Sequence, residues 1–153
     1  AAASAVRGSG LGLLGIGLPD IPLFAASLLR SLGQIARGYG YITSTRKERR
    51  IMLLVLDAAL AGGMEYPALS DQLDQALSGT ELTGLSEQEL ADRVAGKLAE
   101  ELLAAKFLQG IPLAGVVGGV LDSRLTARLL DYAALKYNRR FLLDHRPAGA
   151  AGL

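Results

Sequence analysis

The sequence predicts an all-α fold, a single-domain bundle of about five helices with two apolar Gly-rich segments. Apolar residues recur at the three- and four-residue spacing of amphipathic helices. At two places Ser or Thr precedes Glu by three residues, which is the signature of a helix N-terminus. No alternating pattern of useful length indicates a strand. With 153 residues, half of them apolar, the chain is long enough for one domain with a core.

The first helix is predicted to begin at Asp20 and to end at Gly38-Tyr39-Gly40. Asp is a favourable N-cap, and Pro22 is tolerated in a first turn, where its missing N–H has no helical acceptor. Apolar residues follow at helical spacing: Phe24, Leu28, Leu32, Ile35 and Tyr39.

The second helix is predicted to begin after Thr45 and to end at Gly62-Gly63. Thr45 and Glu48 have the spacing of a capping box, in which each residue's side chain bonds the other's backbone N–H. Apolar residues occur on all sides of this helix from Ile51 to Leu60, so we expect it to be buried on most sides.

A short third helix is predicted to start near Pro67 or Ser70. Its apolar stripe is Leu69, Leu73, Ala76 and Leu77. The fourth helix is predicted to run from a second capping box, Ser86 with Glu89, to about Leu108. Three of its charged residues are expected on its outer side: Lys97, Glu100 and Glu101.

The fifth helix is predicted from about Asp122 to Leu143. Its expected apolar face is Leu125, Leu129, Tyr132 and Leu135, with Lys136 beside it. Along the chain we therefore expect an apolar Gly/Ala-rich segment at 1–18, a helical domain at 19–145 and a flexible tail at 146–153.

The two glycine-rich segments run from Gly8 to Asp20 and from Gly110 to Asp122. Each contains several glycines and a proline, ends on an aspartate and precedes a predicted helix. Neither is long enough to cross a membrane, since a spanning helix needs about 20 apolar residues. They suit either close helix crossings inside a bundle or shallow insertion into a bilayer.

Charge is segregated along the chain, although the net charge is only +1. Residues 1–50 carry seven basic and two acidic groups, residues 51–101 two basic and ten acidic, and residues 102–153 seven basic and three acidic. The basic parts are either solvated helix faces or surfaces that meet anionic lipid. Nucleic acid is not an expected partner, because no binding motif or stacking platform appears.

No reaction centre is predicted, and no catalytic residue, metal site or cofactor is assigned. Cysteine is absent, which excludes a thiol nucleophile and thiolate metal ligands. The single histidine, His145, lies near the chain end and is expected to be exposed. The Walker loop, the serine elbow and the zinc-protease helix motif are all absent.

Several blocks of sequence resemble the EcsC protein family. They occur in order over residues 8–143: Leu18-Pro-Asp-Ile-Pro-Leu-Phe24, Tyr39-Gly-Tyr41, Glu48-Arg49, the run from Lys106 to Gly119, and the run from Asp131 to Leu142. The resemblance implies a bacterial-type helical protein with membrane association, and it brings no established reaction. By resemblance only, an ABC transporter is an implied partner. The family-motif residues expected to act structurally are Pro19, Asp20, Pro22, Gly40, Gly110, Pro112, Gly115 and Gly119.

The leading hypothesis is a non-enzymatic protein that is cytoplasmic and peripheral to the inner face of the membrane, where it contacts anionic lipid or a membrane protein. The candidate lipid or partner contacts are Leu11, Leu13, Leu14, Ile16, Leu18, Ile111, Leu113, Val116 and Val117. The candidate contacts to anionic headgroups are Arg46, Lys47, Arg49, Arg50, Arg139 and Arg140. The alternatives are a soluble protein-interaction module without membrane contact, and a hydrolase with an unrecognised site.

Overall fold

The computed structural model describes residues 21–79, 84–108 and 118–146. At residues 105–108 and 118–122 it describes the backbone of the helix and not the side chains. These residues form α1 (Ile21–Gly38), α2 (Arg46–Leu60), α3 (Glu65–Leu77), α4 (Glu87–Leu108) and α5 (Gly118–Asp144). No strand occurs within the described ranges. The predicted all-α bundle is confirmed, and the predicted helices match these five within a few residues.

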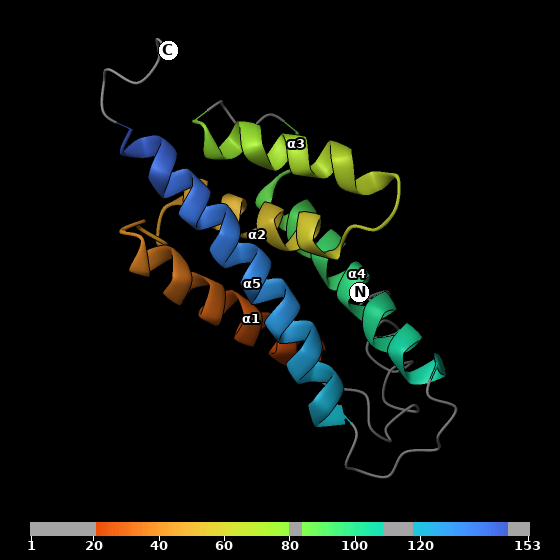
Figure 1. The fold of residues 1–153 in the computed structure, drawn as a ribbon. Helices are drawn as coiled ribbons and strands as arrows, with labels where there is room; N and C mark the ends of the chain where they lie inside the picture. Colours follow the sequence, from red (N-terminus) through yellow and green to blue (C-terminus); the bar gives the residue numbers. More distant parts are fainter. Residues whose placement is uncertain (1–20, 80–83, 109–117, 147–153) are drawn as a thin grey trace, which may run out of the picture.

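Helix α2 is the centre of the bundle, with α1, α3, α4 and α5 packed around it (Figure 1). Every residue from Ile51 to Ala58 is buried. The prediction that this helix is covered on most sides is therefore confirmed. Because each buried Leu or Ile contributes roughly 1.5–3 kcal/mol, α2 supplies a large share of the stabilising burial.

Helices α1 and α5 lie side by side and run in the same direction (Figure 1). Helix α1 ends in a Schellman motif, in which Gly40 N–H donates to the Arg37 carbonyl at 2.9 Å and Tyr41 N–H to the Ala36 carbonyl at 3.0 Å. Gly40 has a φ of +87°, in the region that favours glycine. The turn brings Tyr41 back against the last turns of α5.

The predicted face of α5 is confirmed at Leu129, and at Leu125 and Tyr132, which pack partly buried against the core, but it is wrong at Leu135. Leu129, Ala133 and Tyr137 are fully buried, whereas Leu135 is 64% exposed. Successive helical residues are rotated by about 100°, so Leu135 lies roughly 200° around the helix from Ala133. Lys136 and Arg140 are buried in its place, because each has an acidic partner inside the bundle.

Lys97 is also not on the outer side of α4, where it was predicted. Its Nζ lies 2.9 Å from Asp57 Oδ1 and 3.0 Å from Glu65 Oε2. Asp57 is fully buried in the middle of α2, and Arg93 of α4 approaches its other oxygen at 3.2 Å. The distances are those of ion pairs, although the directions are not those of hydrogen bonds. A buried carboxylate needs such cations, and this need draws Lys97 inward.

Helix α3 begins at Glu65, before both predicted starting points, and its predicted stripe is buried in full. Pro67 is thus the third residue of the helix. A helix tolerates proline there because its first N–H groups have no intrahelical acceptor.

Candidate functional site

Both glycine-rich segments adjoin the same end of the bundle. The first turn of α1, the last turn of α4 and the first turn of α5 lie together there (Figure 1). We call these three turns the glycine end. Of the predicted structural residues, Pro22 lies in the first turn of α1 and Gly119 in the first turn of α5.

The remaining residues predicted in the glycine segments lie outside the described ranges. They are Leu11, Leu13, Leu14, Ile16, Leu18, Pro19, Asp20, Gly110, Ile111, Pro112, Leu113, Gly115, Val116 and Val117.

The six predicted headgroup contacts lie at the other end of the bundle. There α1 ends, α2 and α4 begin, and α5 ends; Tyr41 bonds Asp144 at 2.8 Å, and Arg49 pairs with Glu87 at 2.8 Å. We call this part the basic end. Helix α1, with 18 residues, separates it from the glycine end by about 27 Å. The predicted headgroup contacts thus lie at the end of the bundle opposite the three described turns that adjoin the glycine-rich segments.

Four of the six basic side chains at this end have partners within the protein. Arg140 pairs with Glu48 at 2.9 Å, and Arg139 with Asp74 at 2.7 Å. Arg49 pairs with Glu87 and also donates to the Ser44 carbonyl at 2.7 Å. Arg50 donates to the Leu85 carbonyl at 2.7 Å.

Arg46 and Lys47 are both exposed, and neither has an ion-pair partner among the described residues. They are therefore the two side chains of the predicted set that make neither an ion pair nor a side-chain hydrogen bond with the described residues.

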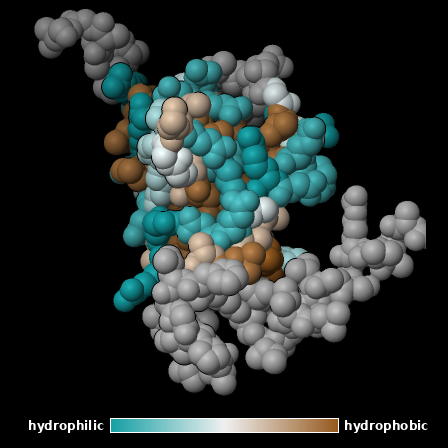
Figure 2. Space-filling model, turned by 90° about the vertical axis from the view of Figure 1, so that its right-hand side faces the viewer, coloured by the Kyte–Doolittle hydropathy of each residue, from teal (hydrophilic) through white to brown (hydrophobic). Residues whose placement is uncertain are grey.

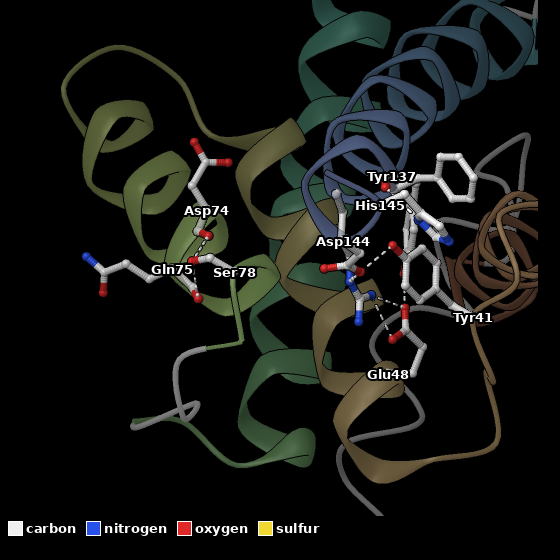
Figure 3. Close-up of polar contacts among 10 residues, drawn as sticks. Tyr41, Glu48, Asp74, Gln75, Ser78, Tyr137, Asp144 and His145 are labelled. Carbon is white, nitrogen blue, oxygen red and sulfur yellow. Dashed lines mark hydrogen bonds and ion pairs between the residues drawn. The ribbon is translucent and has the colours of Figure 1, made fainter. Parts of the chain in front are cut away.

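Five residues from the α1–α2 loop, α2 and α5 form a polar cluster at the basic end (Figure 3). We call it the Glu48 cluster; its members are Tyr41, Glu48, Tyr137, Arg140 and Asp144. Glu48 accepts hydrogen bonds from Tyr137 Oη at 2.5 Å and from an Arg140 terminal nitrogen at 3.0 and 2.9 Å to its two oxygens. The Arg140 guanidinium lies over the Tyr41 ring at 3.8 Å. Tyr41 Oη in turn donates to Asp144.

The local sequence explains how Glu48 reaches this cluster. Thr45 caps α2 as predicted, since its hydroxyl accepts from Glu48 N–H at 3.1 Å. The Glu48 side chain does not bond back to Thr45, so only half of the capping box forms. It points inward instead, because Tyr137 and Arg140 offer stronger, charge-assisted bonds. At Ser86 and Glu89, where no such partners compete, both halves form.

The Glu48 cluster has the chemistry of a structural clamp. Burial, together with the hydrogen bond to Glu48, raises the pKa of Tyr137 well above its ordinary value. Burial and the bond to Asp144 do the same to the pKa of Tyr41. Both tyrosines are thus neutral donors at physiological pH, and Arg140 balances the Glu48 charge. The cluster closes the end of α5 onto the start of α2 and presents no activated nucleophile.

A separate hollow of about 340 Å³ lies between α3 and α5, beside Asp74, Gln75 and Ser78. These three residues lie apart from the Glu48 cluster (Figure 3). Asp74 is already occupied by Lys136 at 2.8 Å and by Arg139. The Ser78 hydroxyl donates to the Asp74 and Gln75 carbonyls at the end of α3. These polar groups complete the helix end and its ion pairs.

Within the described ranges, no three or more His, Asp or Glu side chains are grouped so that they suit a metal ion. None of the described helices is both long enough and apolar enough to cross a membrane. His145 is exposed, and its ring stacks on Phe141 with the centroids 4.0 Å apart.

A family model described as the EcsC protein family matches residues 1–142. The chain belongs to the EcsC protein family. No curated protein and no solved structure gave a match. In this EcsC-family protein, three of the blocks that carried the resemblance meet at the Glu48 cluster: Tyr39–Tyr41, Glu48-Arg49 and Asp131–Leu142. The cluster therefore joins segments of the family pattern that are far apart in the sequence.

Two buried acidic groups of the EcsC-family chain were missed in the sequence. The sequence predicts Glu48 as part of a cap and of the Glu48-Arg49 block of the family resemblance but not as a buried ion-pair partner, and it predicts no role for Asp57. A signal for Asp57 was present, because it is the one charged residue among the apolar residues from Ile51 to Leu60. An ionised group in such a helix requires partners from neighbouring helices. The partners themselves, Arg93 and Lys97, cannot be identified without knowing how α4 packs.

Alkaline pH is expected to destabilise this EcsC-family fold. Burial raises the pKa of Tyr132 to about 12, and the pKa of Tyr137 and of Tyr41 is raised as well. The folded state therefore keeps protons that the unfolded state releases above about pH 10. This stabilising contribution is complete below about pH 10 and is lost as the pH rises toward the folded-state pKa values.

The test is urea unfolding of the wild type and of Tyr137→Phe from about pH 8 to about pH 11. The fully buried Tyr137 alone should contribute a slope of about −1.4 kcal/mol per pH unit above about pH 10. Tyr137→Phe should remove that part of the slope. An unchanged slope in the variant would contradict the assignment.

Proposed function

We propose that this EcsC-family protein is a non-enzymatic peripheral membrane protein, and that the glycine end is the part that contacts the bilayer. One observation carries the proposal. Two segments about 100 residues apart in the sequence, both apolar and rich in glycine, adjoin the same end of the bundle. The apolar side chains of both can therefore meet one surface at the same time.

Two exposed apolar side chains of the described residues lie at this end and are available for such contact. Leu23 in the first turn of α1 is 69% exposed, and Leu103 near the end of α4 is also exposed. Figure 2 shows hydrophobic surface along the lower edge of the described part, and further hydrophobic patches higher on the same face among hydrophilic residues. Each Leu that enters the bilayer contributes roughly 1.5–3 kcal/mol, so a few of them suffice for attachment.

The charge distribution favours attachment through apolar contact over attachment through arginine. Three of the six basic groups predicted to meet headgroups form ion pairs within the protein, at the opposite end. Near the glycine end, Arg128 pairs with Glu101 at 3.3 Å, whereas the exposed Arg124 has no ion-pair partner among the described residues. We therefore propose that attachment to the membrane depends only weakly on salt. We also propose that it takes place at the cytoplasmic face of the membrane. A membrane protein such as a transporter is the other partner that the family resemblance implies.

The test is co-sedimentation with phosphatidylcholine vesicles, with and without phosphatidylglycerol, at low and moderate salt. We expect pelleting with both lipids that moderate salt does not abolish. Leu23→Asp should weaken binding roughly tenfold or more, since it places a charge where a Leu side chain would be buried. Leu13→Asp and Val116→Asp examine the two segments themselves, with the fold checked by circular dichroism.

Ile42→Asp is the matched control. Ile42 is 69% exposed, the same fraction as Leu23, but it lies in the loop after α1 at the basic end. The Ile42→Asp variant should pellet with the vesicles to the same extent as the wild type. Equal loss in both variants would overturn the choice of end. A wild type that stays in the supernatant with every vesicle would overturn the membrane proposal and favour a soluble interaction module.

A further inference from the structure

A pocket of about 420 Å³ lies between the middle of α1 and the first turns of α2 and α4. Its floor is apolar, with Leu29, Met52 and Leu53, and its rim is charged, with Arg46, Arg49 and Glu87. This volume lies within the range of small-molecule sites. The pocket belongs to the basic end, so the membrane contact proposed above does not include it.

The rim carries more positive than negative charge. Arg49 bonds both oxygens of Glu87, at 2.8 and 3.4 Å. This bond lowers the pKa of Glu87, and the charges of Arg49, Arg46 and Arg50 lower it further. The rim thus holds two arginines and one carboxylate. Arg49 is taken up by Glu87, and Arg46 has no ion-pair partner among the described residues.

We propose that this pocket binds a single-chain anionic amphiphile, with its head beside Arg46 and its chain along Leu29, Met52 and Leu53. The apolar floor suits an alkyl chain, and the excess positive charge of the rim suits a phosphate or carboxylate head. None of the described lining residues is aromatic, so the pocket offers no ring on which a nucleobase would stack.

The probe for the test is octyl phosphate, used below the concentration at which it forms micelles. Inorganic phosphate and 1-octanol separate the two halves of the ligand. Isothermal titration calorimetry should show binding of octyl phosphate, with both halves at least about tenfold weaker, because each makes only part of the contacts. Phosphate binding as tight as octyl phosphate would reveal only an adventitious anion site and would overturn the proposal, as would no binding of octyl phosphate.

Arg46→Gln and Lys47→Gln form a matched pair. The two residues are adjacent and exposed, and each substitution removes one positive charge, but of the two only Arg46 lines the pocket. Arg46→Gln should weaken octyl phosphate binding roughly tenfold, the loss expected for one charge-assisted hydrogen bond. Lys47→Gln should change it by less than about twofold, since exposed charges further away are screened. Equal weakening by both variants would show a diffuse electrostatic effect and overturn the proposal.

The same variants separate this pocket from the membrane contact. Leu23→Asp lies at the glycine end and should leave octyl phosphate binding unchanged. If Arg46→Gln instead abolishes vesicle pelleting while octyl phosphate does not bind, Arg46 contacts the bilayer and the pocket proposal fails. If octyl phosphate binds but vesicles do not, the pocket stands and the membrane proposal fails.

Discussion

Replacing Arg140 with methionine is expected to lower the free energy of unfolding by about 3–5 kcal/mol. The substitution keeps much of the side chain's length but leaves Glu48 buried with only Tyr137 as a partner. An ionised carboxylate without its cation costs far more inside a protein than in water. Arg140 also covers the Tyr41 ring, so some packing is lost as well.

Arg139→Met is the control for this prediction. The neighbouring arginine loses the same charge, but its side chain is 58% exposed, against 10% for Arg140. Its partner Asp74 keeps Lys136, so the expected loss is below about 1 kcal/mol. Urea unfolding of both variants gives the comparison. Similar losses of unfolding free energy in the two variants would mean that the burial of Arg140 does not explain its contribution to stability.

A double variant, Glu48→Leu with Arg140→Met, adds a sharper test. Removing both charges together is expected to restore much of the stability lost by Arg140→Met alone, because no unpaired charge remains buried. A double variant less stable than the single one would show that packing and the Tyr137 hydroxyl, which loses its acceptor, outweigh the buried charge.

Leu129→Ala is expected to cost about 2–5 kcal/mol, the usual range for a fully buried leucine that leaves a cavity. Leu129 lies on the face of α5 that packs into the core with Ala133 and Tyr137. The expected size of the loss depends on how far neighbouring side chains relax into the space. Chemical unfolding measured by circular dichroism gives the value.

Leu135→Ala tests the same helix on its other side. It should change stability by no more than about 0.5 kcal/mol, since most of that side chain is in water. A large loss at Leu135 would refute its exposed position in the structure and favour the place expected for it from the sequence.

The sequence was sufficient for the helices because their signals are local. The Ser86–Glu89 box, the apolar residues of α2 and the glycines after α1 each act within a few positions. The buried face of α5 is harder to predict, because the apolar Leu135 is exposed and the charged Lys136 is buried. Lys136 is buried since Asp74 lies opposite it, and this pairing joins residues 62 positions apart. Hydrophobicity alone therefore places these two side chains wrongly.

The segregation of charge along the chain is matched by ion pairs between its thirds in the structure. Acidic residues of the middle third pair with basic residues of the outer thirds: Glu87 with Arg49, Asp74 with Arg139, and Glu101 with Arg128. Much of the positive charge in the outer thirds is therefore used within the bundle. The sequence shows both charge blocks, but only the packing shows that they face each other.

The position of α5 has a consequence for biosynthesis. Glu48 and Arg140 are 92 residues apart, and α2 is covered on one side by α5, which leaves the ribosome after the other four described helices. At a synthesis rate of about 5–20 residues per second, Arg140 follows Glu48 after roughly 5–20 s. During that interval the side of α2 that α5 will cover stays accessible, which is the kind of surface that nascent-chain chaperones hold. The arrival of α5 is therefore the step that completes the core.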